Sequence, residues 1–131
     1  MSAAKEVLID TDVLIWLARG NPNASRVIDA LGDWVISSVS YMEMLQGCRN
    51  KHEQKTLQKA FRSTQDTILG VTPAINDQAI ALVERHALSH SLLMADALIA
   101  ATALEHSLPL LTGNGKHFKV VDGLQIVIFK P

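Results

Sequence analysis

Cysteine is almost absent from this sequence, and neither sign of charge is in excess. Cys48 is the only cysteine, which excludes an internal disulfide framework and favours a reducing compartment. Twelve Lys and Arg residues against 13 Asp and Glu residues give a formal net charge of −1, which excludes a polybasic arm but leaves room for a local basic stripe. Apolar runs long enough to span a bilayer and a signal-peptide pattern are also lacking, so we expect a cytoplasmic protein with no membrane partner.

The chain does have enough apolar residues to build one core. Hydrophobic residues make up 48% of it and charged residues 19%, which is typical of a packed globular protein rather than a disordered one. Its length suits one domain over residues 1–131, with no internal repeat or linker.

Short apolar runs alternate with helical patterns along the chain. Because these runs lack a regular polar–apolar alternation, they favour an α/β fold with a mostly parallel sheet of four or five strands, covered on both faces. In such sheets ligands bind beyond the carboxyl ends of the strands. The expected strands are 7–9, 34–36, 68–71, 110–111 and 125–129, and the expected helices are 13–20, 24–31, 40–50, 53–63, 74–87 and 91–106.

Asp96 is the only charged residue of segment 91–104, which makes up most of the apolar helix expected at 91–106. The positions three and four residues away from it are all apolar, so the helix is expected to be buried on every side. Burying an isolated ionised carboxylate costs several kcal/mol of folding free energy unless a cation or strong hydrogen-bond donors contact it. A metal site is favoured over the alternative, in which backbone donors or a buried Arg satisfy the carboxylate.

Asp10 and Asp12 follow the first expected strand directly. We expect Asp10 to be a metal ligand, because it lies where open α/β sheets place their ligand contacts. Asp12 is expected to cap the following helix and to contact the metal ligands without binding the metal itself. Two acids at this spacing are a weak signal by themselves.

Glu43 follows the second expected strand and has two interpretations. Ser40 and Glu43 have the spacing of a capping box, in which the Glu side chain returns to the Ser backbone N–H. The alternative is a ligand role together with Asp10 and Asp96. Such a set of hard oxygen donors from three separate elements binds Mg²⁺ or Mn²⁺, and without the ion these acids would repel a nucleic-acid backbone.

Four blocks of the chain resemble the ordered motifs of PIN-domain ribonucleases, above all the VapC-type toxins of toxin–antitoxin pairs. They read LIDTDVLI at 8–15, SSVSYME at 37–43, DALIAATA at 96–103 and LLTGNGKHF at 110–118. The resemblance implies a three-layer α/β/α PIN-like domain and Mg²⁺- or Mn²⁺-dependent cleavage of RNA by an activated water. It also implies a homodimer and a small VapB-like antitoxin as partner.

The resemblance assigns catalytic roles residue by residue. Asp10, Glu43 and Asp96 match the family's acidic positions as metal ligands, and Asn114 takes the place where the family often has a further Asp. Asp12 stands where Asn or Ser is common, so we expect it to restore some of the charge that Asn114 lacks.

Five further residues are candidates for supporting the site or contacting RNA. Thr112 is expected to contact an acid or the substrate, or else to be an ordinary strand-end hydroxyl. His117 is expected to contact RNA or to support its loop. Lys51, Lys55 and Lys59 form one stripe of a helix, which fits either a phosphate backbone or a solvated face.

Two other functions compete with the ribonuclease. The pattern Asp10-Thr-Asp12 after a strand also suits a haloacid-dehalogenase-like phosphatase, in which one Asp is the nucleophile and the next the acid–base group. A non-catalytic RNA- or partner-binding module with the same fold is the second, because Asn114 replaces an acid.

Overall fold

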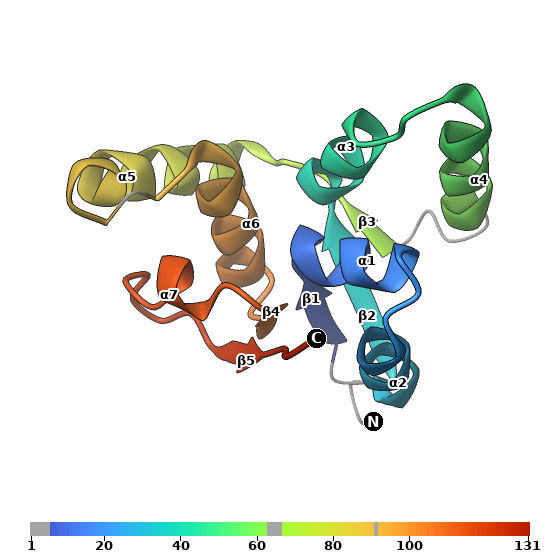
Figure 1. Ribbon diagram of the computed structural model, residues 1–131. Helices are drawn as coiled ribbons and strands as arrows, with labels where there is room; N and C mark the ends of the chain where they lie inside the picture. Colours follow the sequence, from blue (N-terminus) through green and yellow to red (C-terminus); the bar gives the residue numbers. More distant parts are fainter. Residues whose placement is uncertain (1–5, 63–66, 91) are drawn as a thin grey trace, which may run out of the picture.

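The computed structural model describes residues 6–62, 67–90 and 92–131. Its centre is a five-stranded sheet in the order β3-β2-β1-β4-β5, and every neighbouring pair is parallel (Figure 1). This confirms the expected parallel α/β architecture. The strands are β1 (Glu6–Ile9), β2 (Asp33–Ser37), β3 (Ile68–Leu69), β4 (Leu110–Thr112) and β5 (Ile126–Ile128).

Successive residues of a strand enter different cores, because strand side chains alternate between the two faces of a sheet. Leu8 is fully buried in one apolar cluster and Ile9 in the other. Leu110 and Leu111 divide between the same two clusters. The sheet is therefore the middle of three layers, with helices on both sides.

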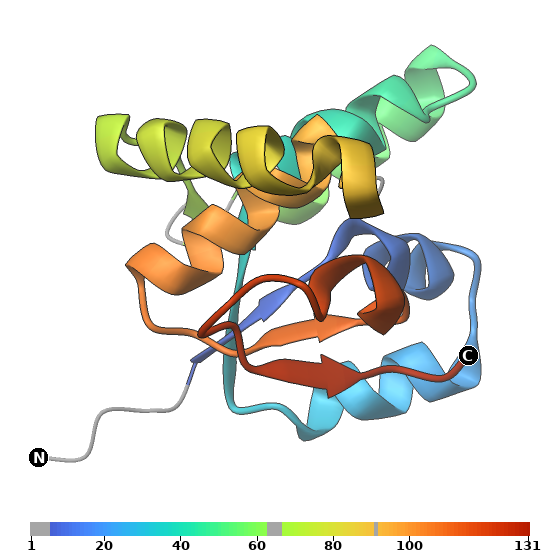
Figure 2. The same cartoon turned by 90° about the vertical axis from the view of Figure 1, so that its left-hand side faces the viewer.

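The helices are divided between these two faces: α5, α6 and α7 lie to the left of α1 and α2 in Figure 1, and Figure 2 looks at the molecule from that left-hand side. Helices α5, α6 and α7 supply the cluster around Leu8, whereas α1 and α2 supply the cluster around Ile9. The helices are α1 (Thr11–Ala18), α2 (Pro22–Ala30), α3 (Ser38–Gln46), α4 (Lys51–Arg62), α5 (Pro73–His90), α6 (Met94–Glu105) and α7 (Gly115–Phe118).

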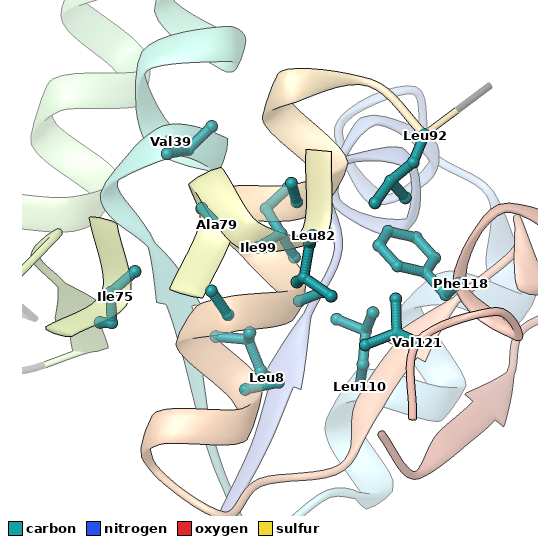
Figure 3. Packing of buried hydrophobic residues seen from close by; sticks show 14 of the residues in the cluster. Leu8, Val39, Ile75, Ala79, Leu82, Leu92, Ile99, Leu110, Phe118 and Val121 are labelled. Atoms are coloured by element: carbon teal, nitrogen blue, oxygen red, sulfur yellow. The ribbon is translucent and has the colours of Figure 1, made fainter. Parts of the chain in front are cut away.

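Helix α6 forms the centre of the larger cluster (Figure 3). Its Ala97, Ala100 and Ala103 are completely buried, and small side chains at this spacing let neighbouring elements approach closely. Phe118 of α7 closes the same cluster and is also completely buried. The packing of α6 and α7 fixes where Asp96 and the loop after β4 lie.

Two of the differences between the expected and the observed helix starts change the site. The helix expected from Ser40 starts at Ser38, because the Ser37 side chain caps it by accepting a hydrogen bond from the Val39 backbone N–H at 3.0 Å. The helix expected from position 91 starts at Met94, with Leu93 as its N-cap. Positions 63 and 91 of the expected helices lie outside the described residues.

Within the described part of the chain, we find no helix whose length and apolar character would carry it across a bilayer.

Candidate active site

Asp10 and Thr112 meet at the carboxyl ends of the neighbouring strands β1 and β4. Asp10 caps α1, where its Oδ1 accepts a hydrogen bond from the Thr11 N–H at 2.8 Å. Its Oδ2 accepts a second one from Thr112 Oγ1, also at 2.8 Å. The side chain is only 4% exposed, so both oxygens are oriented by neighbours rather than by bulk water.

The surroundings of Asp10 oppose its negative charge. Burial raises its pKa from 3.8 to about 7, and the charges of Asp12 and, more weakly, Asp96 act in the same direction. The hydrogen bonds from Thr112 and from the Thr11 N–H lower the pKa but do not offset the burial. A divalent cation would reverse this balance, because it favours the ionised carboxylate.

Asp12 does not cap α1, in contrast to the sequence-based expectation. Asp10 precedes the helix in an extended conformation and takes the cap, which leaves Asp12 in the first turn. The Asp12 Oδ2 accepts a hydrogen bond from the Gly113 N–H at 3.0 Å, and burial raises the pKa of its carboxyl group. Asp12 therefore ties the start of α1 to the loop after β4.

Glu43 is bound to α1 rather than to the start of its own helix. Thr11 Oγ1 lies 2.7 Å from Glu43 Oε1 and 2.8 Å from Ser40 Oγ. The capping-box interpretation of Ser40 and Glu43 is wrong, because Ser37 is the N-cap of α3 and both residues lie inside the helix. Glu43 is thus held by Thr11, the residue that follows Asp10 in the sequence.

Asp96 lies at a helix N-terminus and not in the middle of a buried helix. It belongs to the first turn of α6, its side chain is 18% exposed, and its Oδ2 accepts a hydrogen bond from the Leu93 N–H at 3.4 Å. The free N–H groups of a first turn favour a carboxylate, so its desolvation is milder than the sequence predicted. His117 Nδ1 of α7 lies 3.6 Å from the same oxygen.

The donors at this site are carboxylate oxygens, which suit Mg²⁺ or Mn²⁺. In residues 6–62, 67–90 and 92–131, however, no group of three or more His, Cys, Asp or Glu side chains lies close enough together to hold a metal ion. Among the same residues, the only ion pair at Asp10, Asp12 or Asp96 is the contact with His117, so no Lys or Arg neutralises these acids. The metal-ligand set remains a prediction.

Of the other candidate residues, the structure places Asn114 close to the acids and the lysines of α4 away from them. Asn114 is exposed at the N-cap of α7, and its backbone N–H donates to Thr112 Oγ1 at 2.9 Å, so Thr112 links Asp10 to this loop. The stripe of Lys51, Lys55 and Lys59 is exposed on α4, which Figure 1 places on the other side of α1 and α3 from α7.

Sequence reasoning missed three residues that organise the site. Thr11 holds Glu43, Ser40 contacts the same Thr11 hydroxyl, and Gly113 lies against Asp12. A Cβ atom on Gly113 would lie 2.7 Å from Asp12 Oδ2, which shows that only glycine fits there without a shift. A hydroxyl between two acids was the available signal for Thr11, whereas nothing local marks Ser40.

Comparisons with known proteins match a parallel α/β fold of this kind, with Asp10 and Asp12 after the carboxyl end of β1. The family model of the PIN domain matches residues 7–124, so this chain belongs to the PIN domain family. No curated protein matches the chain significantly.

Solved structures with the same fold come from several bacteria. A toxin–antitoxin complex from Klebsiella pneumoniae contains a chain 30% identical to this one, with a TM-score of 0.77 and coverage of 92% of this chain and 95% of that one. FitAcB from Neisseria gonorrhoeae is 24% identical, with a TM-score of 0.75 and coverage of 92% and 95%. VapBC2 from Rickettsia felis, bound to a promoter DNA fragment, is 18% identical, with a TM-score of 0.76 and coverage of 95% and 99%.

Proposed function

We propose that this protein is a metal-dependent endoribonuclease and the toxin component of a toxin–antitoxin pair. Membership of the PIN domain family and the likeness to a toxin–antitoxin complex from Klebsiella pneumoniae support the proposal. The observation that carries it is the buried Asp10 beside Asp12 and Asp96, where burial raises its pKa to about 7 and no Lys or Arg of the described residues pairs with these acids. The family match replaces the haloacid-dehalogenase-like phosphatase as an explanation of the Asp10-Thr-Asp12 pattern.

The residues that would hold the metal are Asp10, Glu43 and Asp96, with Asn114 completing the site. Their oxygen donors fit Mg²⁺ or Mn²⁺, and a cation would offset both the burial of the Asp10 charge and its repulsion by Asp12. When bound, the ion would lower the pKa of a water molecule and offset the negative charge of a phosphodiester.

The remaining polar residues of the site position these acids. Thr112 orients Asp10 through Oδ2, and Thr11 holds Glu43 through its hydroxyl. Asp12 fixes the loop after β4 through the Gly113 N–H. His117 lies beside Asp96, where it would contact the substrate phosphate.

The proposal includes a VapB-like antitoxin, a homodimer and a location in the cytoplasm. Support for protein partners comes from large apolar side chains that are exposed on α1, on α3 and at the start of α6. Exposed apolar side chains are typical of protein interfaces when they form a patch. The exposed side chains at these places are Ile15, Trp16, Met42, Leu93 and Met94.

RNA cleavage by the purified protein, with Mn²⁺ or with EDTA, tests the proposal directly. We expect Mn²⁺-dependent products, and we expect Asp96→Asn to lower the cleavage rate by at least about 100-fold because it removes a charged ligand. Equal cleavage by Asp96→Asn would identify a contaminating nuclease.

The same protein samples distinguish the alternatives. Tight RNA binding with no cleavage in Mn²⁺ would favour the non-catalytic module that Asn114 suggested. Release of phosphate from a small phosphomonoester, without RNA cleavage, would contradict the proposal in favour of phosphatase chemistry.

A further inference from the structure

A surface hollow of about 410 Å³ lies next to the acid site, on the side of α7. It is lined by Gly113, Gly115, Lys116, Lys119, Ile126 and Ile128. Gly113 belongs both to this hollow and to the acid site, because its backbone N–H donates to Asp12 Oδ2. A ligand in the α7 hollow would therefore lie close to Asp12.

The two lysines of the α7 hollow are available to a ligand. Lys116 and Lys119 are exposed, and neither takes part in an ion pair with another described residue. They lie three positions apart, on α7 and at its end. They introduce positive charge into a hollow that reaches Gly113 and, through it, Asp12, and such charge would attract a polyanion.

The floor of the α7 hollow is apolar. Ile126 and Ile128 belong to β5, an edge strand of the sheet, and Ile128 is 53% exposed. Gly115 leaves this floor uncovered, since a Cβ atom there would lie 2.5 Å from Ile128 Cδ1. Cations at the rim and an apolar floor match a single nucleic-acid strand, which offers phosphates and the faces of its sugars and bases.

We infer that the α7 hollow binds the stretch of single-stranded RNA next to the scissile phosphate, with Lys116 and Lys119 on its backbone phosphates and Ile128 against a ribose or base. This inference rests on the proposed ribonuclease function. RNA is favoured over an acidic peptide because every nucleotide carries both a phosphate for a lysine and a flat base or sugar face for the floor, whereas in a peptide these two features lie on different residues. The volume suits a nucleotide rather than a duplex.

Binding of a fluorescent single-stranded RNA of about ten nucleotides tests the inference, measured by anisotropy in Mn²⁺ on the Asp96→Asn background. We expect Lys116→Gln/Lys119→Gln to weaken binding about tenfold and to reduce the slope of log K against log salt by about 1.4, since each phosphate contact on a single strand contributes about 0.7. Lys51→Gln/Lys55→Gln on α4 removes the same charge and is expected to leave the slope unchanged.

The apolar floor has a separate signature. We expect Ile128→Asn, at a half-exposed position, to weaken RNA binding about threefold while leaving the salt slope unchanged, because it removes apolar contact and no charge. Circular dichroism of each variant would verify that it remains folded.

Several results would overturn the inference. If Lys116→Gln/Lys119→Gln changes neither the RNA affinity nor its salt dependence, RNA does not bind in the α7 hollow. If only the α4 variant changes them, the RNA lies along α4. Loss of acidic-peptide binding with unchanged RNA binding would assign the hollow to a peptide. These outcomes leave the proposed function intact if the wild type still cleaves RNA in Mn²⁺, whereas failure of that cleavage counts against the proposed function.

Discussion

Thr112 Oγ1 lies 2.8 Å from Asp10 Oδ2, although the two residues are 102 positions apart in the sequence. The same hydroxyl oxygen accepts the Asn114 N–H at 2.9 Å. One buried side chain thereby joins the first strand, the fourth strand and the loop that follows it. Such a connection orients Asp10 as the acid site requires.

Replacing Thr112 should affect both stability and activity. We expect Thr112→Val to lower the free energy of unfolding by about 1–2 kcal/mol, since it leaves Asp10 Oδ2 and the Asn114 N–H without this partner. RNA cleavage should fall as Asp10 loses its orientation. Urea unfolding and Mn²⁺-dependent cleavage rates measure the two effects.

Thr102→Val is the matched control for this change. Thr102 is also fully buried, but its hydroxyl donates to the Leu98 carbonyl within α6 at 2.7 Å. Its replacement should leave cleavage unchanged. A similar loss of activity in both variants would contradict a special role for Thr112.

The raised pKa of Asp10 predicts that the metal-free protein loses stability as the pH rises. Folding favours the protonated carboxyl group, so its contribution is fully present below about pH 3.8 and is lost as the pH passes about 7. Asp10→Asn lacks this titration. Between pH 4 and pH 8 in EDTA, the free energy of unfolding should shift in favour of the variant by on the order of 1–3 kcal/mol. Parallel stability curves for the two proteins would contradict the prediction.

Glu43→Gln separates a metal-ligand role from a structural one. The amide oxygen can still accept the Thr11 hydroxyl, so we expect the melting temperature of the metal-free protein to stay close to that of the wild type. Affinity for Mn²⁺, measured by calorimetry, should fall at least about tenfold because a negative charge is lost. Glu84→Gln, on the exposed side of α5, is the control and should change neither quantity. Unchanged affinity in Glu43→Gln would remove Glu43 from the ligand set.

Gly113→Ala should disturb Asp12 through direct contact. The added Cβ would lie 2.7 Å from Asp12 Oδ2, so the carboxylate must move away from the Gly113 N–H. We expect a loss of stability of about 1 kcal/mol or more and weaker Mn²⁺ binding. Gly32→Ala meets no atom within 4 Å and should be neutral.

A double substitution tests whether Asp12 mediates this effect. In the Asp12→Ala background the added methyl group has room, so the costs of the two changes should not add. Additive costs would show that Gly113 acts independently of Asp12. Normal metal affinity and normal cleavage in Asp12→Ala alone would remove the idea that Asp12 compensates for Asn114.

Local pattern was sufficient for the architecture. The short apolar runs around Leu8 and Val35 predicted strands of a parallel sheet, and the structure confirms both. Helix starts were predicted less accurately, because the N-cap can be any of several neighbouring polar residues. In α3, for example, the N-cap is Ser37 and not Ser40. That difference removed one of the two interpretations of Glu43, and the later start of α6 moved Asp96 into a first turn.

The order of apolar and polar residues, by itself, determined the strands, the layers and the acids to consider, because burial and strand alternation act locally along the chain. Only the tertiary structure decided that Thr112 contacts Asp10, that Thr11 holds Glu43 and that His117 lies beside Asp96. These partners lie on different elements, and their contacts depend on how β1, β4, α3 and α7 pack. No local rule encodes that packing, because it is set by the shared cores on the two faces of the sheet.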